Sequence, residues 1–364
     1  MKQTRTKTGR NRIAGCRVFS LLLVLLLLGT AITAGQETIV YGAAATPVSR
    51  HGRLSVKGAD LVDGKKNRFQ LRGISTHGIN WDIGYPYVNK AAFKTLRDDW
   101  GVNAVRLAMY TSEYNGYCSG GSTSDLKNRI YKGVKYATEL GMYVIIDWHI
   151  LNDGNPKSHL SQAKSFFATM SKKYSKQKNV IYEICNEPNG CSWSTIRSYA
   201  EQVISTIRKY DKNAVIIVGT PTWSQLGSDG TSNEVAKNPV KGYKNIMYSL
   251  HFYANEWSHN KYLPDKLVYA RKKNLPVMVT EFGMSAASGG GGISTSSTGK
   301  WLSRLDKYNI SYFCWSLSNK NESCSLLSSR TRKTSQWKNS ELSKAGQYIR
   351  SKYRARKKAL GSKA

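Results

Sequence analysis

Eight short runs of apolar residues, rich in β-branched and aromatic side chains, recur along the chain at intervals of roughly 30 to 40 residues. Polar and glycine-containing segments bound each run, a pattern typical of strands that are buried in a sheet. We therefore predict eight strands, over 69–74, 104–109, 143–148, 180–186, 215–218, 246–252, 277–281 and 312–317.

The segments between these runs have apolar residues at helical spacing and are rich in good helix formers. Gly101 and Gly141 directly follow two of the segments, where a left-handed residue commonly ends a helix. The helical pattern is weakest between the fifth and sixth strands. We predict helices over 89–100, 125–140, 161–174, 195–210, 267–273 and 299–308.

This alternation of strands and helices predicts an α/β fold. Eight units favour a closed (β/α)8 TIM barrel, because closure leaves no edge strand unpaired. An open, doubly wound sheet is the alternative, but no glycine-rich phosphate loop follows the first strand, which argues against its nucleotide-binding version. The glycine-rich segment 285–292 precedes the eighth unit, and we interpret it as a loop of the active face rather than a linker.

The 364 residues are 40% hydrophobic and 11% aromatic, enough for one large core. The first residues are basic, and an apolar run from Phe19 to Leu28 and then small residues follow, the order found in an export signal. The apolar run is short for a bilayer span, and an uncleaved signal anchor is the alternative. We predict a signal peptide over 1–34, a lead-in over 35–51, one folded domain over 52–350 and a basic C-terminal tail over 351–364.

The formal net charge of +32 at pH 7 stays strongly positive when the signal segment is removed. Such an excess attracts polyanions, so non-specific contact with anionic polymers is expected. A solvated surface that keeps the protein soluble is the simpler interpretation of most of these charges. The sequence contains no recognised basic nucleic-acid motif, and we predict no specific nucleic-acid partner.

Five of the six cysteines follow the predicted signal, an odd number that leaves at least one thiol unpaired. A disulfide framework is therefore not expected to organise the fold. Cys185 and Cys314 fall inside predicted strands, where a buried structural thiol is the preferred interpretation. The cysteine spacing matches no metal site, and we expect neither a metal nor another cofactor.

Two glutamates stand at the carboxyl ends of predicted strands, where a parallel barrel builds its active face. Glu187 follows the fourth strand and Glu281 ends the seventh. A single glutamate in such a place often serves only an ion pair or a loop contact. A pair suits glycosidic-bond hydrolysis, because one carboxyl protonates the departing oxygen while a second, ionised one meets the positive charge that develops at the anomeric carbon.

Three motifs resemble a known family: IYEICNEPNG at 181–190, VTEFGMS at 279–285 and DWHILNDGNP at 147–156. The sequence is similar to glycoside hydrolase family 5 (clan A), specifically its bacterial cellulase branch. NEP alone is a weak signal, whereas NEP on the fourth strand together with TEFG on the seventh is highly specific. The resemblance covers about 52–350 and extends to GISTHGINW at 73–81, VRLAMY at 105–110, GTPTWSQ at 219–225, YSLHFYA at 248–254 and WSLSNKNE at 315–322.

The resemblance implies a retaining double displacement. Glu281 would attack the anomeric carbon, while Glu187 would first donate a proton and then activate water. Carboxyls roughly 5 to 5.5 Å apart are expected for this chemistry. Arg106 and Tyr253 would orient Glu281 and keep it ionised, because a nearby cation or donor favours the carboxylate. The resemblance places three further residues in the same subsite: Asn186, on the sugar 2-hydroxyl, and His149 and His251, as donors to sugar hydroxyls or to the glutamates.

Sugars present flat C–H faces that stack on aromatic rings, so tryptophan and tyrosine side chains should line a glycan cleft. By resemblance, Trp315 floors the subsite beside the cleaved bond, and Trp223 lies on the leaving side. Trp81 and Tyr110 are the other aromatic candidates at strand ends. The resemblance places three polar residues against sugars further up the cleft: His77, Lys320 and Glu322.

Some conspicuous residues are expected to be structural. Glu183 has the same strand parity as Glu187 and would point into the barrel, so we predict a buried, paired carboxylate there rather than a third catalytic acid. Packing is the preferred interpretation for most tryptophans without motif support, which are Trp100, Trp148, Trp193, Trp257, Trp301 and Trp337.

The sequence therefore predicts a secreted, monomeric endo-β-1,4-glucanase (cellulase) that acts on cellulose and related β-glucans. A membrane anchor through an uncleaved signal is the alternative localisation. Mannanase, xyloglucanase or lichenase activity is the first alternative function, because one catalytic frame serves several activities. A non-catalytic carbohydrate- or wall-binding barrel is a remote one, disfavoured by the two intact glutamates. The strong positive charge departs from the acidic or mildly charged cellulases common in this branch.

Overall fold

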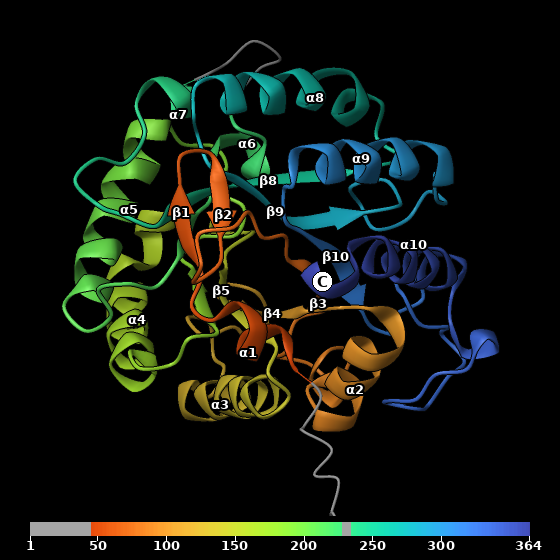
Figure 1. Ribbon diagram of the computed structural model, residues 1–364. Coiled ribbons are helices and arrows are strands. Elements are labelled where there is room, and N and C mark those ends of the chain that lie inside the picture. The colour runs from red at the N-terminus through yellow and green to blue at the C-terminus, as the bar shows by residue number, and fades with distance from the viewer. Residues whose placement is uncertain (1–44, 228–233) are drawn as a thin grey trace, which may run out of the picture. The chain divides into compact units, whose positions relative to one another are not determined.

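The computed structural model describes residues 45–227 and 234–364. The predicted signal peptide (1–34) and most of the lead-in lie outside the described residues. Within them, eight parallel strands close into a barrel in the order β10-β3-β4-β5-β6-β7-β8-β9, with helices around it (Figure 1). The predicted (β/α)8 barrel is confirmed, and the open sheet is excluded.

The eight barrel strands coincide with the eight predicted runs. Parallel strands are covered on both faces, so their sequences are continuously apolar, and every residue of these eight strands is buried. They are β3 (Arg72–Thr76), β4 (Ala104–Tyr110), β5 (Tyr143–His149), β6 (Val180–Glu183), β7 (Ile216–Val218), β8 (Ile246–Tyr253), β9 (Val277–Gly283) and β10 (Tyr312–Leu317).

The predicted helices are present, with different ends. The first half of α8 contains Pro264 and has no apolar stripe, so its sequence gives no helical signal, and the helix begins ten residues before our predicted start. The α-helices are α1 (Pro47–His51), α2 (Lys90–Thr95), α3 (Thr123–Glu139), α4 (Leu160–Tyr174), α5 (Trp193–Arg208), α6 (Pro221–Ser224), α7 (Glu234–Lys237), α8 (Trp257–Lys272), α9 (Thr295–Tyr308) and α10 (Lys344–Leu360). Shorter or tighter turns are η1 (Tyr85–Tyr87), η2 (Leu96–Trp100, a π-helical turn), η3 (Pro156–His159), η4 (Asn339–Glu341) and η5 (Gly361–Lys363).

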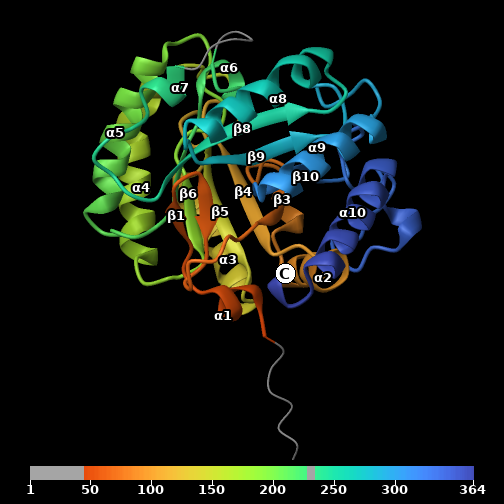
Figure 2. The same ribbon diagram turned by 45° about the horizontal axis from the view of Figure 1, so that its top comes forward.

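The C-terminal segment differs from our prediction of a basic tail over 351–364. Helix α10 runs through it to Leu360, and Figure 2 shows this helix beside α2. Ile349 and Tyr353 are one helical turn apart and fully buried, and the Tyr353 hydroxyl donates to the Gly73 carbonyl at 2.9 Å. The basic residues occupy the rest of the helix surface. The segment is therefore an amphipathic helix whose apolar stripe packs on the domain, although its sequence is dominated by charge.

The N-terminal elements were not predicted either. Within the expected lead-in, α1 is capped by the Thr46 side chain, and the Val48 amide donates to the Gly141 carbonyl at 2.9 Å. An antiparallel hairpin of β1 (Ser55–Lys57) and β2 (Asp60–Val62) follows. Leu61 of this hairpin and Leu54 just before it pack on side chains from the strand starts, so the hairpin closes the amino-terminal end of the barrel.

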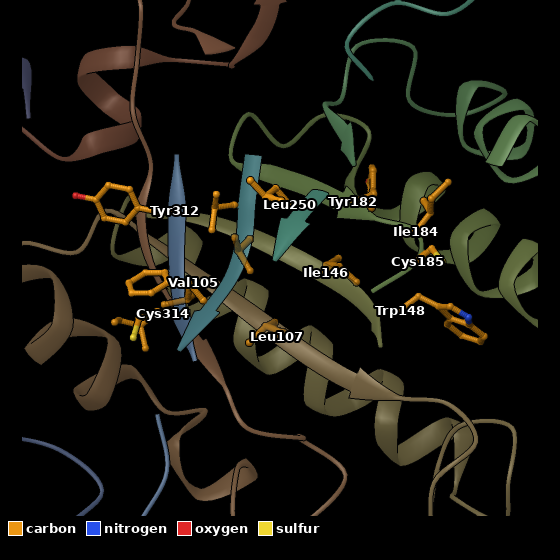
Figure 3. Close-up of a cluster of buried hydrophobic side chains, with 14 of the residues drawn as sticks. Val105, Leu107, Ile146, Trp148, Tyr182, Ile184, Cys185, Leu250, Tyr312 and Cys314 are labelled. Atoms are coloured by element: carbon orange, nitrogen blue, oxygen red, sulfur yellow. The ribbon is translucent and has the colours of Figure 1, made fainter. Parts of the chain in front are cut away.

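Side chains alternate between two layers along each strand. Val105 and Leu107 face the helices, as do Ile146 and Trp148 (Figure 3). Arg106, Asp147 and the other residues of opposite parity face the barrel interior. The outer layer forms the main hydrophobic core, and the inner layer is apolar near the strand starts and polar towards the strand ends. The fold therefore concentrates polar groups at one end of the barrel.

The remaining sequence expectations concern cysteines and membranes. Among the described residues, none of the five cysteines forms a disulfide. Cys185 and Cys314 are buried as predicted, and burial raises the pKa of both thiols, which keeps them protonated. A search of residues 45–227 and 234–364 finds no helix with both the length and the apolar character of a membrane span.

Candidate active site

Glu281 is held on both of its carboxylate oxygens. It lies on β9, with 4% of its surface exposed. Arg106 Nη1 donates to Oε2 at 3.0 Å, and the Tyr253 hydroxyl donates to Oε1 at 2.8 Å. These contacts are charge-assisted hydrogen bonds, which fix orientation as well as charge. Burial raises the pKa of Tyr253 well above its usual value, and the charge of Glu281 adds to this, so the hydroxyl remains a donor.

Arg106 links this carboxylate to the interior of the barrel. Its Nε donates to Glu183 Oε2 at 2.7 Å, and its Nη2 donates to Asn186 Oδ1 at 2.6 Å and lies 3.0 Å from Asp147 Oδ2. Burial would lower the pKa of Arg106, but Asp147, Glu183 and Glu281 together raise it. Buried charges are stable only when paired. Glu183 is thus the buried, paired carboxylate that we predicted.

Glu187 has a different environment. His251 Nδ1 lies 2.8 Å from Glu187 Oε1, and 13% of the Glu187 side chain is exposed. One carboxylate oxygen of Glu187 lies within 4.8 Å of one of Glu281, with His251 in the same cluster. Burial opposes a charge on His251, but the nearby Glu183 carboxylate and the hydrogen-bonded Glu187 raise its pKa to about 9.

His149 and Asn186 complete the layer below the glutamates. His149 Nδ1 lies 2.6 Å from Asp147 Oδ2, and Asn186 Nδ2 lies 3.2 Å from His149 Nε2. Burial and the Arg106 charge lower the pKa of His149 to about 3, so the ring is neutral. Because the Asn186 amide donates to Nε2, the single ring proton lies on Nδ1 and is donated to Asp147.

Aromatic rings cover one side of this polar layer. Trp315 stacks on His149 with ring centroids 5.3 Å apart and lies 5.2 Å from the His77 ring. Tyr110 packs on His149 at 4.1 Å and on Trp81 at 4.7 Å. Burial, with a smaller contribution from a nearby lysine, lowers the pKa of His77 to about 4, so this ring is neutral.

Trp223 stands apart at the mouth of the site, 44% exposed. It belongs to α6, a short element that is not a regular α-helix but a left-handed turn, in which Thr222, Trp223 and Ser224 have φ of 60°, 51° and 60°. Such a conformation is strained for residues other than glycine and persists only when contacts fix it. Here Ser224 Oγ donates to the Asn186 carbonyl at 2.6 Å, and the Trp223 amide donates to the Pro188 carbonyl at 3.1 Å. The turn therefore ties Trp223 to the segment that bears Glu187.

Two loops form another wall. The Cys324 amide donates to the Gly289 carbonyl at 3.0 Å, which joins the glycine-rich loop to the segment after β10. In that segment Lys320 Nζ lies 2.6 Å from Glu322 Oε2. Ala287, the neighbouring serine and Gly289 line the cleft, so the segment 285–292 is an active-face loop, as predicted.

All these groups meet at one cleft of about 650 Å³. Of the predicted site residues, all but three line the cleft: Arg106 and Asn186 are fully buried, and Trp81 is partly exposed outside the lining. Further lining residues were not named as site residues from the sequence. Some lie in the motifs 147–156 and 219–225 or in the loop 285–292, and the others lie at or near the start of α8. The further lining residues are Leu151, Thr222, Gln225, Glu256, Ser258, His259, Ala287, Ser288 and Gly289.

A model of the cellulase family (glycosyl hydrolase family 5) matches residues 62–321. The chain belongs to this family. It is therefore a glycoside hydrolase, and the cleft with its two glutamates is the candidate active site of that enzyme. Our expectation that no metal takes part stays a prediction. The described residues contain one cluster with metal-ligand geometry, and it consists of Glu187, His251 and Glu281.

Curated relatives of this glycoside hydrolase are named endoglucanases. The endoglucanase of Clostridium saccharobutylicum is 44% identical over 337 residues, which are 92% of this chain and 71% of that protein. Endoglucanase 5 of Pectobacterium carotovorum subsp. carotovorum is 43% identical over 333 residues, 91% of this chain and 63% of that protein. The chain thus spans less than two thirds of the second relative.

Solved structures agree with this assignment. The catalytic domain of Thermobifida fusca endoglucanase Cel5A has a TM-score of 0.80 and 38% identity, and the match covers 85% of this chain and 99% of that domain. A variant of the same domain in complex with cellotetraose has a TM-score of 0.78 over the same shares.

The tryptophans without motif support are mostly packed in this hydrolase, as expected. Trp100, Trp148 and Trp301 are almost completely buried, as are Trp193 and Trp337. Trp257 is the exception: it is 67% exposed at the first position of α8, with Lys261 Nζ 4.5 Å from its ring centre. No local pattern distinguishes a packed tryptophan from this exposed one.

Proposed function

We propose that this family 5 hydrolase is a retaining endo-β-1,4-glucanase with Glu281 as the nucleophile and Glu187 as the acid/base. The observation that supports this most strongly is the close approach of two carboxylates with unlike surroundings. One oxygen of each lies within 4.8 Å of the other, a separation that favours direct attack over a water held between them. Glu281 accepts hydrogen bonds from the Arg106 guanidinium and the Tyr253 phenol. Glu187 contacts one imidazole, that of His251, and is partly exposed.

In the first step, a Glu281 oxygen bonds to the anomeric carbon, the glycosidic C–O bond breaks, and the proton of Glu187 passes to the departing oxygen. In the second step, a water oxygen bonds to the same carbon, its proton passes to Glu187, and the Glu281 ester bond breaks. Both enzyme carboxyls are then restored. The protein contributes proton transfer, a placed nucleophile and a preorganised charge.

Asn186 would donate to the sugar 2-hydroxyl. Its Oδ1 is occupied by Arg106, and its Nδ2 donates to the Ile150 carbonyl at 3.0 Å and to His149 Nε2 at 3.2 Å. The longer bond, to His149, is the one that a sugar hydroxyl would replace. The bound sugar then stacks on Trp315, and the next unit on the leaving side meets Trp223.

The substrate assignment rests on the relatives, which are named endoglucanases, and on a structural relative that binds cellotetraose. We propose β-1,4-glucan as the substrate of this enzyme, with export from the cell through the segment 1–34 and action as a monomer. N-terminal sequencing of secreted protein tests the predicted cleavage after Ala34, and light scattering tests the monomer. An intact N-terminus in the membrane fraction would instead support the signal anchor.

The direct experiment compares carboxymethylcellulose, mannan, xyloglucan and lichenan as substrates of the wild-type protein, Glu187→Gln and Glu281→Gln. We expect reducing-sugar release from carboxymethylcellulose, and a loss of at least about 100-fold in each variant. Glu201→Gln, an exposed glutamate on α5, is the matched control and should keep full activity. Near-full activity of either site variant would refute the assigned roles, and cleavage of mannan alone would refute the substrate.

The stereochemistry tests the mechanism separately. Proton NMR during the first minutes of cello-oligosaccharide hydrolysis should show the β-anomer forming first, before mutarotation. Initial formation of the α-anomer would overturn the retaining mechanism while leaving the substrate assignment intact. A fall in the viscosity of carboxymethylcellulose that precedes most of the reducing-sugar release is the corresponding test of internal cleavage.

A further inference from the structure

Thr280 is a fully buried residue next to the proposed nucleophile, and its hydroxyl lies at a junction of three polar groups. Its Oγ1 is 2.6 Å from Glu183 Oε1, 2.8 Å from His251 Nε2 and 3.1 Å from Ser249 Oγ. A hydroxyl has one hydrogen to donate, so only one of these contacts can receive it. The identity of that acceptor decides the state of His251.

Glu183 is the acceptor. Burial would raise its pKa, but the charge and hydrogen bond of Arg106 and the nearby His251 ring lower it to about 2. The carboxylate is therefore ionised and can only accept. Ser249 Oγ also donates to Glu183 Oε1, at 3.1 Å. The short 2.6 Å contact therefore takes the Thr280 hydrogen.

The Thr280 oxygen must then accept a hydrogen bond from His251 Nε2. This fixes a proton on Nε2, and Nδ1 faces Glu187 Oε1 at 2.8 Å. A neutral ring would accept at Nδ1 and draw the Glu187 proton onto Oε1, away from the substrate. A doubly protonated ring donates to Oε1 and leaves Oε2 to bear the reactive proton.

The charges around His251 favour the doubly protonated ring. Glu183 Oε1 lies 3.9 Å from Nε2, and burial, which opposes the charge, is outweighed by the carboxylates, so the pKa of His251 rises to about 9. The titratable and charged groups that face the ring come from four strands, the segment after β6 and one helix: Arg106 (β4), Asp147 and His149 (β5), Glu183 (β6), Glu187 (after β6), Glu281 (β9) and His259 (α8).

We propose that Thr280 and Glu183 are positioning residues for the acid/base: they hold His251 as a double donor that occupies Glu187 Oε1 and reserves Oε2 for the proton transferred in both steps. This inference rests on the proposed role of Glu187. Neither residue touches the substrate, and no proton moves through Thr280 during the reaction. Glu183 also holds Arg106, so Thr280 is the residue whose effect is confined to the steps that need the acid/base.

Leaving-group dependence separates this role from a structural one. A 2,4-dinitrophenyl β-cellobioside needs little protonation of its departing oxygen, whereas the phenyl β-cellobioside needs the full acid. For Thr280→Val at pH 6.5, we expect kcat/KM to fall about tenfold on the phenyl substrate and less than twofold on the dinitrophenyl one. The tenfold loss is a part of the ~10²–10⁴-fold contribution of acid/base catalysis, because Glu187 itself remains. Thr280→Ser, which keeps the hydroxyl, should restore the phenyl rate to within twofold.

Controls make the failures distinguishable. Thr298→Val removes a buried hydroxyl that bonds within α9 and does not line the cleft, and it should leave both rates unchanged. Glu187→Ala should itself lose activity on the phenyl substrate much more than on the dinitrophenyl one. Equal losses on the two substrates would refute the proposed role of Glu187. The positioning role is refuted if Glu187→Ala behaves as expected but Thr280→Val lowers kcat/KM equally on the phenyl and dinitrophenyl substrates. It is also refuted if Thr280→Val lowers neither value.

Imidazole ¹⁵N NMR of the wild-type protein tests the same point without any variant. Both nitrogens of His251 should be protonated at pH 7, and above pH 9 to 10 the remaining proton should stay on Nε2. In Thr280→Val the neutral ring should become a mixture of tautomers. A neutral ring at pH 7, or a wild-type tautomer with its proton on Nδ1, would overturn the proposal.

Discussion

Arg106 Nη1 lies 3.0 Å from Glu281 Oε2, and both side chains are buried. The two residues are on β4 and β9, which are not neighbours in the barrel. The same guanidinium also contacts Glu183 and Asp147, so one cation serves three carboxylates. Catalysis and stability are coupled at this residue, because removing the cation would leave the carboxylates without a partner.

Arg106→Met should therefore cost stability as well as activity. We expect the free energy of unfolding to fall by about 3–5 kcal/mol, because the variant leaves buried charges uncompensated. Urea denaturation at pH 7 measures this. Arg197→Met, which removes a partly exposed arginine on α5, is the control and should change stability by less than about 0.5 kcal/mol. A loss below about 1 kcal/mol in Arg106→Met would contradict the buried network.

Trp223→Ala should weaken substrate binding without affecting the fold. The ring is 44% exposed at the cleft mouth, and loss of one stacking contact of about 0.5–1.5 kcal/mol corresponds to a rise in KM of roughly 2- to 12-fold. Steady-state kinetics on cello-oligosaccharides measure this. Trp257→Ala removes an even more exposed tryptophan that does not line the cleft, and its KM should equal that of the wild type. Equal changes in both variants would refute a specific role for Trp223.

Stability should decline on the alkaline side as His251 loses its proton. Its pKa in the folded protein, about 9, lies above the value of about 6.5 in the unfolded chain, so its contribution is complete below pH 6.5 and is lost as the pH rises through 9. The shift corresponds to about 3 kcal/mol. Denaturation at pH 6.5, 8 and 9.5 should show the decline, which should be shallower in His251→Gln. Identical slopes would contradict the raised pKa.

At acidic pH, the stability of the protein should depend on two histidines that are neutral in the folded state. Burial lowers the pKa of His149 to about 3 and that of His77 to about 4. The unfolded chain takes up protons on both residues below about pH 6.5, so stability should fall as the pH drops from 6.5 towards 4. Calorimetry across this range measures the effect. A melting temperature that stays constant from pH 6.5 to 4.5 would contradict the two lowered pKa values.

The positive charge should produce weak, salt-sensitive binding of anionic polymers. A groove of about 1070 Å³ between α8 and α9 is rich in cations and has a single acid, Asp265. Retention on a polyanion column should disappear by about 0.5 M salt, where screening is strong. A triple variant tests the groove: Lys300→Glu, Arg304→Glu and Lys307→Glu. The control variant carries the same charge change at Lys172, Lys176 and Lys178, in and after α4. The groove variant should elute at lower salt than this control. Retention that resists salt, or equal elution of both variants, would refute a localised electrostatic site.

Local pattern predicted the repeating part of the structure. The eight strands are continuous apolar runs, and the polar residues at their ends include both glutamates, because strand parity and the direction of parallel strands place them on one face. The motif residues are likewise brought to one cleft. The hairpin β1–β2 and helix α10 were missed, since their apolar residues are few and bury only against distant parts of the chain.

By itself, the sequence determined the eight strands and the pair of glutamates at the strand ends, and it favoured a closed barrel. Only the tertiary structure decided which polar groups bind one another. Arg106 pairs with a residue 175 positions away in the sequence, and Thr280 bonds to both Glu183 and His251. Periodicity reflects which face of an element is buried, a local property of the chain. A hydrogen-bond network depends on distances between strands that are remote in sequence, and those distances exist only after the barrel has closed.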